Sequence, residues 1–221
     1  MNSVLNKLID NTRKVPFNEI MGYASTNVEA YSNGNDTYTS KENSYLYGIY
    51  MGIKWQCVEY SRRWLFIRKG CVFKSIEGAA DMWTQVDYAQ RVVDEKCFSF
   101  KKYANGSSSP PVNESLLIYS RSGVDMPQGH VAVIIDVLPN FIRVAEENWD
   151  PFYWSGNYSR EIPYDFLNGN YYIRDNYTIL GWMLLDDNNQ TQPLDQSTIN
   201  TIIQLNGSSS DFICHNNIIH H

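Results

Sequence analysis

The spacing of apolar positions predicts one well-defined helix in the first third of the chain. Over residues 57–69, Val58 and Leu65 lie on the same side of a helix, and charged residues occupy much of the remainder. Gly70 follows as a natural C-cap, because glycine readily adopts the left-handed conformation that ends many helices. We expect a second helix over residues 78–93.

The second half of the chain has the pattern of β-structure. Aliphatic and aromatic side chains form short runs, bounded by turn residues, at residues 116–119, 131–138, 141–148 and 177–185. A two-residue Pro-Asn connection separates the middle two runs, so we expect those strands to pair as a hairpin. Helices followed by strands predict an α+β domain.

Polar segments divide the chain into three parts. Residues 1–19 are mostly polar and are interpreted as an N-terminal arm. We expect one domain over residues 20–186 and a loosely packed polar tail over residues 187–221, and a chain of 221 residues can build such a domain with a full core. Within the domain, residues 45–55 are aromatic and contain two glycines, which indicates an irregular approach to the first helix.

Composition argues against several classes of function. The formal net charge of -6 and the pI of about 5.2 offer no basic surface to nucleic acid. Residues 1–13 lack the apolar core of a secretory signal, and the longest aliphatic run, residues 131–135, is far too short to cross a membrane. We therefore expect a cytoplasmic protein with no nucleic-acid or membrane partner.

The four cysteines, at positions 57, 71, 97 and 214, show no metal-binding spacing. Without a CxxC pair we expect no zinc site, and we expect no other metal and no cofactor. Without a secretory signal we expect no disulfides, because the cytosol keeps thiols reduced. Cys71, Cys97 and Cys214 are interpreted as ordinary thiols, which leaves Cys57 as the cysteine in a distinctive position.

Three residues occur in an order typical of papain-like cysteine hydrolases. Cys57 opens the first predicted helix, His130 opens an aliphatic strand, and Glu146 closes the next strand. The thiolate is the reactive form of cysteine, and both a helix N-terminus and a nearby imidazolium lower the pKa of a thiol. The backbone N–H of Cys57, free at a helix start, is available to an oxyanion. This order predicts a nucleophile, a base and an orienting acid for cleavage of an amide.

Strand alternation distinguishes two adjacent acids. Glu146 shares one face of its strand with Ile142 and Val144, whereas Glu147 lies on the opposite face. The apolar face is expected to point inward, so we predict that Glu146, and not Glu147, orients His130.

Beyond this order of residues, the sequence resembles a known family. The similar segments follow one another across residues 20–186: Gly22-Tyr23-Ala24, Lys54-Trp55-Gln56-Cys57-Val58-Glu59-Tyr60-Ser61-Arg62-Arg63, Asn105-Gly106-Ser107, Pro110-Pro111-Val112, Leu116-Leu117-Ile118, Gly129-His130-Val131-Ala132, Ala145-Glu146-Glu147-Asn148 and Thr178-Ile179-Leu180-Gly181-Trp182-Met183. In these segments the chain resembles the amidase domain of bifunctional glutathionylspermidine synthetase/amidase, one of the CHAP group (cysteine, histidine-dependent amidohydrolases/peptidases). The resemblance implies a papain-like CHAP fold, with N-terminal helices packed on an antiparallel β-sheet.

The resemblance also implies a reaction and a set of site residues. The reaction is hydrolysis of the amide of glutathionylspermidine to glutathione and spermidine through an acyl-enzyme. The residues that match the family's triad are Cys57, His130 and Glu146, and those that match its substrate pocket are Arg62, Asn148 and Gln56. A guanidinium at this pocket would suit a glutathione carboxylate.

The substrate-pocket assignments have structural alternatives. Arg62 could instead pair with Glu59 on the helix surface, and Asn148 could simply end a strand as a turn residue. Glu147 and Asp150 follow the orienting strand closely enough to bind the polyamine end of the substrate. Their alternative is that of solvated surface carboxylates.

Other functions stay open from the sequence. A CHAP hydrolase can cleave peptidoglycan instead, and a domain of this fold can act as a non-catalytic binding module. Residues 120–128 diverge from the family pattern, which leaves the substrate open. The sequence shows no counterpart of the family's ATP-grasp synthetase half, so we expect no ligation from this chain. Whether a separate synthetase is a partner is also left open.

Overall fold

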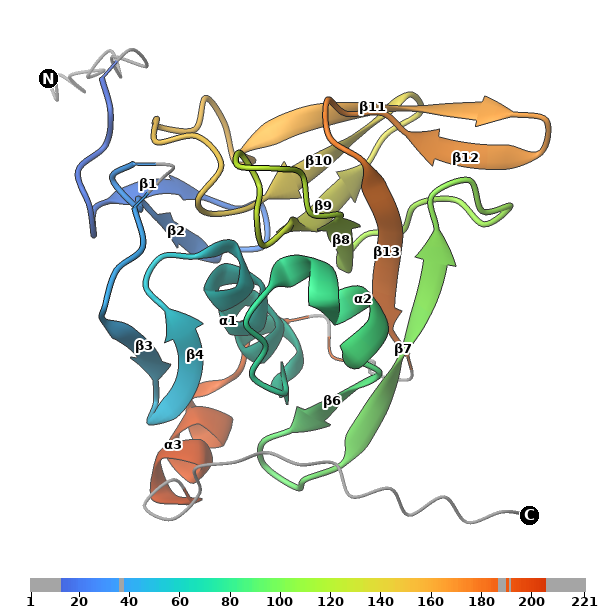
Figure 1. Ribbon diagram of the computed structural model, residues 1–221. Coiled ribbons are helices and arrows are strands. Elements are labelled where there is room, and N and C mark those ends of the chain that lie inside the picture. The colour runs from blue at the N-terminus through green and yellow to red at the C-terminus, as the bar shows by residue number, and fades with distance from the viewer. Residues whose placement is uncertain (1–12, 36–37, 187–189, 191, 206–221) are drawn as a thin grey trace, which may run out of the picture.

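The computed structural model describes residues 13–35, 38–186, 190 and 192–205, and its centre is a large antiparallel sheet (Figure 1). Its elements are β1 (Ile20–Tyr23), β2 (Glu29–Tyr31), β3 (Asn43–Leu46), β4 (Ile49–Ile53), α1 (Cys57–Lys69), β5 (Cys71–Phe73), the 3-10 helix η1 (Ala79–Asp81), α2 (Met82–Gln85), β6 (Tyr88–Arg91), β7 (Cys97–Ala104), β8 (Ser115–Tyr119), β9 (His130–Val137), β10 (Phe141–Ala145), β11 (Arg160–Leu167), β12 (Asn170–Ile173), β13 (Ile179–Leu185) and α3 (Gln196–Leu205). The nine-stranded sheet has the order β12-β11-β10-β9-β8-β13-β7-β6-β5, and β1-β2 and β3-β4 form separate hairpins.

Helix α1 packs between the β3-β4 hairpin and the large sheet (Figure 1). Gln56 precedes it with an extended backbone, and Gly70 ends it in the left-handed conformation, with its N–H bonded to the carbonyl of Phe66. On its sheet side, Tyr60 and Trp64 are fully buried in the main core cluster. The prediction of a helix over residues 57–69 with Gly70 as its cap is confirmed.

The central strands are buried on both faces, which explains their continuous aliphatic sequences. In β8, Leu116 and Ile118 join the core cluster under α1, whereas Leu117 joins a second cluster on the opposite face. The strands predicted at residues 116–119, 131–138 and 177–185 are present with small changes at their ends, and β9 and β10 form the expected hairpin. The α+β fold predicted from the sequence, with a helix packed on an antiparallel sheet, is confirmed.

The second predicted helix is wrong in its extent. Only η1 and the single turn of α2 are helical within residues 78–93, and the backbone is extended at Val86. Strand β6 follows and lies between β5 and β7 in the sheet. Its backbone groups therefore bond to two neighbouring strands, so tertiary pairing replaces the local helix.

The approach to α1 is also more regular than predicted. Residues 45–55 contain most of the β3-β4 hairpin, whose two-residue turn places Tyr47 and Gly48 at φ angles of 51° and 83°. Gly52 has a φ of 144°, and a Cβ there would lie 3.0 Å from the Cβ of Glu59 in α1. The two glycines thus allow a tight turn and a close approach to the helix, where we had expected irregular structure.

Two further expectations are revised, one about the predicted tail and one about Cys97. The predicted polar tail contains α3, whose Ile202 is fully buried in a cluster with Ile49, Met51 and Phe66. Cys97 is disulfide-bonded, so the expectation of an ordinary thiol is wrong for this residue. That expectation rested on the compartment and not on geometry.

Cys57 and Cys71 are free, and Cys214 lies outside the described residues. Among the described elements, no helix has both the length and the apolar character needed to span a bilayer.

Candidate active site

The first residue of α1, Cys57, is nearly buried, with 8% of its surface exposed. Burial by itself raises the pKa of the Cys57 thiol. The charge and hydrogen bond of His130 outweigh burial, with help from the backbone N–H groups of Val131 and Val58, and the pKa is lowered from its usual value. The thiol at the helix start is therefore held toward its thiolate form.

His130 opens β9 after a left-handed turn at Gly129, which has a φ of 70°. A Cβ at Gly129 would lie 2.6 Å from the Cβ of Ala80 and 2.7 Å from the carbonyl oxygen of Tyr119. Only glycine fits there. The segment that approaches Gly129 closely is η1, which contains Ala80.

The imidazole of His130 is fixed on one side by a carboxylate. Its Nε2 lies 2.8 Å from Oε2 of Glu146, which leaves Nδ1 for the thiol of Cys57. Burial alone lowers the pKa of His130, but the hydrogen-bonded Cys57 and Glu146 outweigh it and raise the pKa to about 9. The imidazole is therefore held in its protonated form at neutral pH.

Glu146 directly follows β10, which ends at Ala145 and so is shorter than the strand predicted over residues 141–148. The carboxylate is fully buried, and its Oε1 accepts hydrogen bonds from Nε of Arg160 at 2.6 Å and from Oγ of Ser159 at 3.1 Å. Burial raises the pKa of Glu146, but the charges of Arg160 and His130 lower it to about 2. The structure thus brings together the three residues of the predicted triad.

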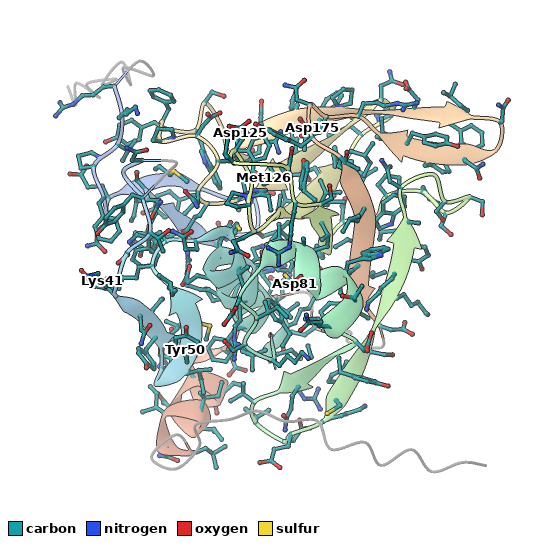
Figure 2. The ribbon with its side chains drawn as sticks, in the orientation of Figure 1. Lys41, Tyr50, Asp81, Asp125, Met126 and Asp175 are labelled. Atoms are coloured by element: carbon teal, nitrogen blue, oxygen red, sulfur yellow. The ribbon has the colours of Figure 1, made fainter. Side chains whose placement is uncertain are left out.

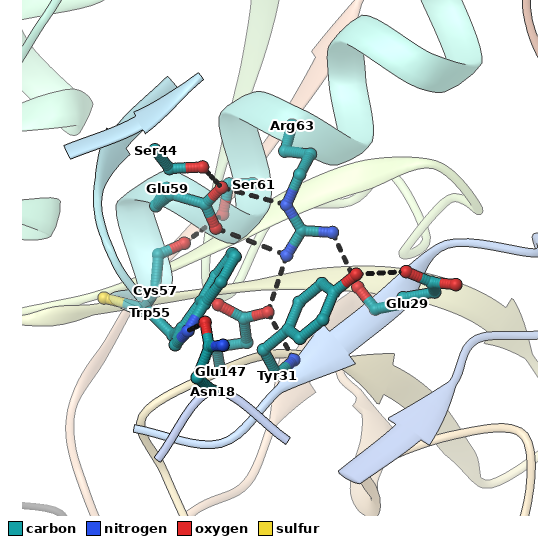
Figure 3. A network of polar contacts seen from close by, with 10 residues as sticks. All are labelled: Asn18, Glu29, Tyr31, Ser44, Trp55, Cys57, Glu59, Ser61, Arg63 and Glu147. Carbon is teal, nitrogen blue, oxygen red and sulfur yellow. Dashed lines mark hydrogen bonds and ion pairs between the residues drawn. The ribbon is translucent and has the colours of Figure 1, made fainter. Parts of the chain in front are cut away.

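Glu147, the next residue, lies in a separate buried network (Figure 3). Its Oε1 accepts hydrogen bonds from Nη2 of Arg63 at 2.6 Å and from the backbone N–H of Tyr31 at 2.7 Å, and Arg63 also contacts Glu59 at 2.9 Å. The side chain of Glu147 is fully buried. Neither interpretation of Glu147 from the sequence is right: the side chain is not a solvated surface carboxylate, and a buried carboxylate with these partners is closed to the polyamine end of a substrate. Contacts with Arg63 of α1 and with the backbone of Tyr31 in β2 accompany this burial.

Arg62 does not make the pairing that the sequence offered as its alternative, because Glu59 pairs with Arg63. The side chain of Arg62 lies 5.8 Å from the rings of both Tyr50, labelled in Figure 2, and Phe73. Only 5% of the residue is exposed, and its Nε has no hydrogen-bond partner among the described residues. Burial lowers its pKa to about 10, so Arg62 is a buried cation at neutral pH.

Gln56 and Asn148 meet beside the nucleophile. Nδ2 of Asn148 donates to Oε1 of Gln56 at 2.9 Å, Nε2 of Gln56 donates to Oδ1 of Asn33 at 3.1 Å, and Nδ2 of Asn33 donates to Oδ1 of Asn148 at 2.9 Å. Asn148 takes a left-handed φ of 57°, as a residue after a strand end can. The three side-chain amides form a closed ring of hydrogen bonds. This ring links the residue before Cys57 to the segment that follows Glu146.

A small hollow opens next to this amide ring. It is lined by Asn33, Asn35, Asn148, Trp149, Asp150 and Pro151. Asp150 is exposed, unlike Glu147. No signal in the sequence marks Asn33 as a site residue, because turn-forming residues surround it. Within the described part of the chain, no cluster of three or more acidic, histidine or cysteine residues could hold a metal ion.

Arg160 is a second site residue that the sequence does not indicate. It is the first residue of β11, a strand that the pattern of the chain did not indicate. Its guanidinium lies 3.6 Å from the centre of the Trp149 ring, which in turn lies 4.9 Å from the ring of His130. No local motif marks such a residue, because it reaches Glu146 only through pairing of β11 with β10.

The structure thus brings together a thiol at a helix start, an imidazole at a strand start and a carboxylate directly after the neighbouring strand, on an antiparallel sheet. Residues 48–148 match the family model of the CHAP domain. The resemblance to the amidase domain of glutathionylspermidine synthetase/amidase that the sequence suggested is likewise confirmed by comparison with characterised proteins.

Three relatives illustrate this similarity. The chain is 34% identical over 185 residues to the bifunctional glutathionylspermidine synthetase/amidase of Escherichia coli strain K12, covering 78% of the chain and 30% of the relative. It is 32% identical over 162 residues to trypanothione synthetase of Crithidia fasciculata, covering 73% of the chain and 24% of the relative. It is 29% identical over 192 residues to glutathionylspermidine synthase of the same organism, covering 78% of the chain and 27% of the relative. The chain thus spans less than a third of each of these relatives.

Proposed function

We propose that this chain is a cysteine amidase that hydrolyses glutathionylspermidine to glutathione and spermidine. The observation that carries the proposal is the line of contacts from Cys57 through His130 to Glu146, found in a chain similar to a glutathionylspermidine synthetase/amidase. Because the pKa of Cys57 is lowered and that of His130 is raised to about 9, the resting site holds a thiolate beside an imidazolium. The nucleophile is then charged before substrate arrives.

In the first half of the reaction, the Cys57 sulfur attacks the carbonyl carbon of the scissile amide. The carbonyl π electrons move to oxygen, and the backbone N–H of Cys57 donates a hydrogen bond to the resulting oxyanion. The carbonyl then re-forms as the C–N bond breaks, and His130 gives its proton to the leaving amine. The products of this half are free spermidine and a thioester between Cys57 and the glutathionyl group.

In the second half, neutral His130 accepts a proton from a water molecule as the water oxygen attacks the thioester. The tetrahedral intermediate collapses with cleavage of the C–S bond, which releases glutathione and restores the thiolate. Glu146 holds the imidazole through Nε2 and stabilises its positive charge in both halves.

Arg62 is our candidate for the carboxylates of the glutathione half. The motivation is its buried charge, with an Nε that has no partner among the described residues, because such a group gains most from an incoming anion. For the polyamine half, exposed Asp150 in the wall of the hollow is the candidate that stays after Glu147 is excluded. Gln56 and Asn148 are our candidates for contacts to the substrate beside the thiol. Their mutual hydrogen bond in the amide ring would keep both side chains in place.

The test compares two substrates under the same conditions. Purified chain is incubated with glutathionylspermidine and, separately, with muropeptides, and the released amines are separated and quantified. We expect spermidine and glutathione in equal amounts, with no release by Cys57→Ala. Cleavage of muropeptides alone would replace the substrate assignment with that of a cell-wall hydrolase, and absence of both activities in protein that binds either substrate would favour a binding module.

The nucleophile has an internal control. Cys71 is also a buried cysteine outside any disulfide, but its Sγ donates to the carbonyl of Lys69, whereas the partner of Cys57 is His130. Iodoacetamide should therefore label Cys57 first, in parallel with loss of activity, and peptide mapping should find Cys71 unlabelled at that stage. Equal labelling of both cysteines would contradict an activated Cys57.

The role of Arg62 is tested by measuring KM after removal of its charge and at increasing ionic strength. Arg62→Met should raise KM for glutathionylspermidine, and the KM of the unaltered enzyme should rise with ionic strength because charges contribute to recognition. Arg143→Met is a suitable control, since Arg143 pairs with Glu161 away from the site. A KM that ignores both salt and the Arg62 substitution would remove Arg62 from the substrate pocket.

A further inference from the structure

We propose that Arg160 is a positioning residue of this site, which keeps Glu146 ionised and oriented so that Cys57 and His130 stay a thiolate-imidazolium pair. The expected effect of Arg160 on catalysis rests on the proposed function. Its expected effect on the Cys57 thiolate does not. It adds a residue from β11 to a site that otherwise draws on α1, β9 and the end of β10.

The contact between Arg160 and Glu146 uses both carboxylate oxygens. Nε of Arg160 lies 2.6 Å from Oε1 and Nη2 lies 3.4 Å from Oε2, the oxygen that also contacts His130. Such a side-on arrangement fixes the plane of the carboxylate as well as its charge. The orientation of Oε2 toward His130 is therefore set from the far side by Arg160.

The guanidinium is itself held on its remaining sides. Nη1 of Arg160 bonds to Oδ2 of Asp175 at 2.6 Å, Nη2 bonds to the hydroxyl of Tyr119 at 2.9 Å, and that hydroxyl donates to the same Asp175 oxygen at 2.7 Å. Asp175, labelled in Figure 2, lies between β12 and β13. Arg160 also stacks on the ring of Trp149. Because the guanidinium is fixed in this way, it restricts the orientation of the Glu146 carboxylate.

The charges around Glu146 explain why a cation is needed there. The titratable groups that face it are His130 from β9, Arg160 from β11, Tyr119 from β8 and Tyr60 from α1. Of these, only His130 and Arg160 can be positive. If Arg160 were neutral, His130 would be the only counter-ion of a fully buried carboxylate, and desolvation would favour the protonated acid.

Protonation of Glu146 would be transmitted to the nucleophile. A neutral acid stabilises an imidazolium poorly, so the proton of His130 would return to the thiolate and the pair would become a thiol and a neutral imidazole. The alkylation rate of Cys57 reports the thiolate directly and needs no substrate. This readout separates a positioning role from a purely structural one.

The experiment measures the rate of Cys57 alkylation by iodoacetamide against pH in folded variants, together with kcat and KM for glutathionylspermidine. In Arg160→Met we expect the alkylation midpoint to rise by about one pH unit or more, which corresponds to about a tenfold change in the thiolate-to-thiol ratio. Turnover should fall through kcat, with a smaller change in KM. Arg160→Lys should recover only part of both effects, because a single ammonium cannot hold Glu146 and Asp175 together as a planar guanidinium does.

A double-mutant cycle tests whether Arg160 acts through Glu146. Once Glu146→Gln is present, adding Arg160→Met should change the alkylation midpoint and kcat little further. Arg143→Met is the matched control: Arg143 lies in the neighbouring strand β10, pairs with exposed Glu161 at 3.0 Å, and should leave both readouts unchanged.

Either of two results would overturn the proposal: an unchanged alkylation midpoint in folded Arg160→Met, or full additivity with Glu146→Gln. Should Arg160→Met not fold, Asp175→Asn removes the second anchor of the guanidinium without removing its charge. A smaller upward shift of the midpoint is expected there, and no shift would count against the assignment. Failure of glutathionylspermidine hydrolysis with the midpoint shift intact would reject the substrate and keep the role of Arg160.

Discussion

Glu146 and Glu147 are consecutive residues, and both are fully buried, yet the chain places them in two networks of opposite character. Glu146 lies between two cations, His130 at 2.8 Å and Arg160 at 2.6 Å. Glu147 shares one cation, Arg63, with a second carboxylate, Glu59. The two sites therefore differ in their ratio of positive to negative groups and not in their burial.

The pKa values follow that ratio. For Glu146, burial raises the pKa but the flanking cations lower it to about 2. For Glu147, burial raises the pKa well above its usual value, Arg63 opposes it, and the nearby charge of Glu59 raises it further. Its Oε2 has no hydrogen-bond partner among the described residues. One carboxyl is set up to stay charged, and its neighbour is set up to hold a proton.

The network of Glu147 has an architectural use. Arg63 comes from α1 and contacts Glu59 on the same helix, Glu147 after β10, and the carbonyl of Glu29 in β2 at 2.7 Å (Figure 3). It therefore joins the helix that begins with Cys57 to the strand end that presents Glu146. We infer that the Glu147 network holds the frame of the site, whereas the Glu146 network takes part in its chemistry.

The largest effect that this comparison predicts is on turnover. Glu146→Gln should lower kcat for glutathionylspermidine by roughly three to four orders of magnitude, because the amide cannot stabilise the imidazolium and favours the wrong tautomer of His130. Steady-state kinetics of the folded variant give the answer. A variant that keeps near-normal turnover would show that Glu146 does not orient the imidazole.

Removal of the shared cation should have the largest effect on stability. Arg63→Met leaves buried Glu59 without a counter-ion and removes the guanidinium that donates to Glu147, and we expect the free energy of unfolding to fall by about 3–5 kcal/mol. Urea denaturation measures the loss. Arg62→Met, the adjacent buried arginine on α1, is the control and should cost less, because Arg62 forms no ion pair within the described residues. Equal losses in the two variants would mean that the ion pairs of Arg63 contribute nothing to the free energy of unfolding beyond the packing of its side chain.

The pH dependence of stability should distinguish the two acids. The pKa of Glu146 is lowered from 4.5 to about 2 in the folded state, so its contribution is present above about pH 4.5 and is lost as the pH falls toward about 2. The difference in unfolding free energy between the unaltered chain and Glu146→Gln should therefore shrink over this interval. A difference that stays constant with pH would show that Glu146 is not held ionised.

The smallest effect is expected from Glu147→Gln. An amide replaces a carboxyl that tends to be protonated, so kcat should change by no more than about threefold. Because the folded-state pKa of Glu147 is raised, its ionisation costs stability as the pH rises through that value, and the variant should gain stability relative to the unaltered chain at higher pH. A drop in turnover as large as that of Glu146→Gln would place Glu147, and not Glu146, behind His130.

The sequence was sufficient for the parts of the molecule that local rules govern. Helix spacing and Gly70 located α1 to the residue, and aliphatic runs located the strands that carry His130 and precede Glu146. Alternation along β10 also predicted that Glu146 and not Glu147 contacts His130, as the 2.8 Å contact shows. Glu146 and Glu147 are both buried, however. Alternation therefore distinguished two buried networks here, and did not distinguish a buried residue from an exposed one.

The missed features depend on contacts between distant segments. Arg160 reaches Glu146 because β11 pairs with β10, and Asn33 reaches Gln56 and Asn148 from a loop more than 20 residues away. Nothing in the spacing of either residue indicates these partners. The sequence predicts helix and not strand β6 because residues 88–91 carry no strong pattern of their own, and pairing with β5 and β7 holds them in the sheet.

Strand β13 also determines the order in which this molecule can be assembled. It is the strand that joins β8 to β7 in the sheet, although it follows both of them in the chain. A growing polypeptide therefore carries two sheet fragments, β5-β6-β7 and β8 to β12, until residues 179–185 have left the ribosome. Each fragment exposes an unpaired edge during that time, and such edges are sites of aggregation. Closure of the sheet is thus a late, long-range event in synthesis, performed by a strand that carries no residue of the triad.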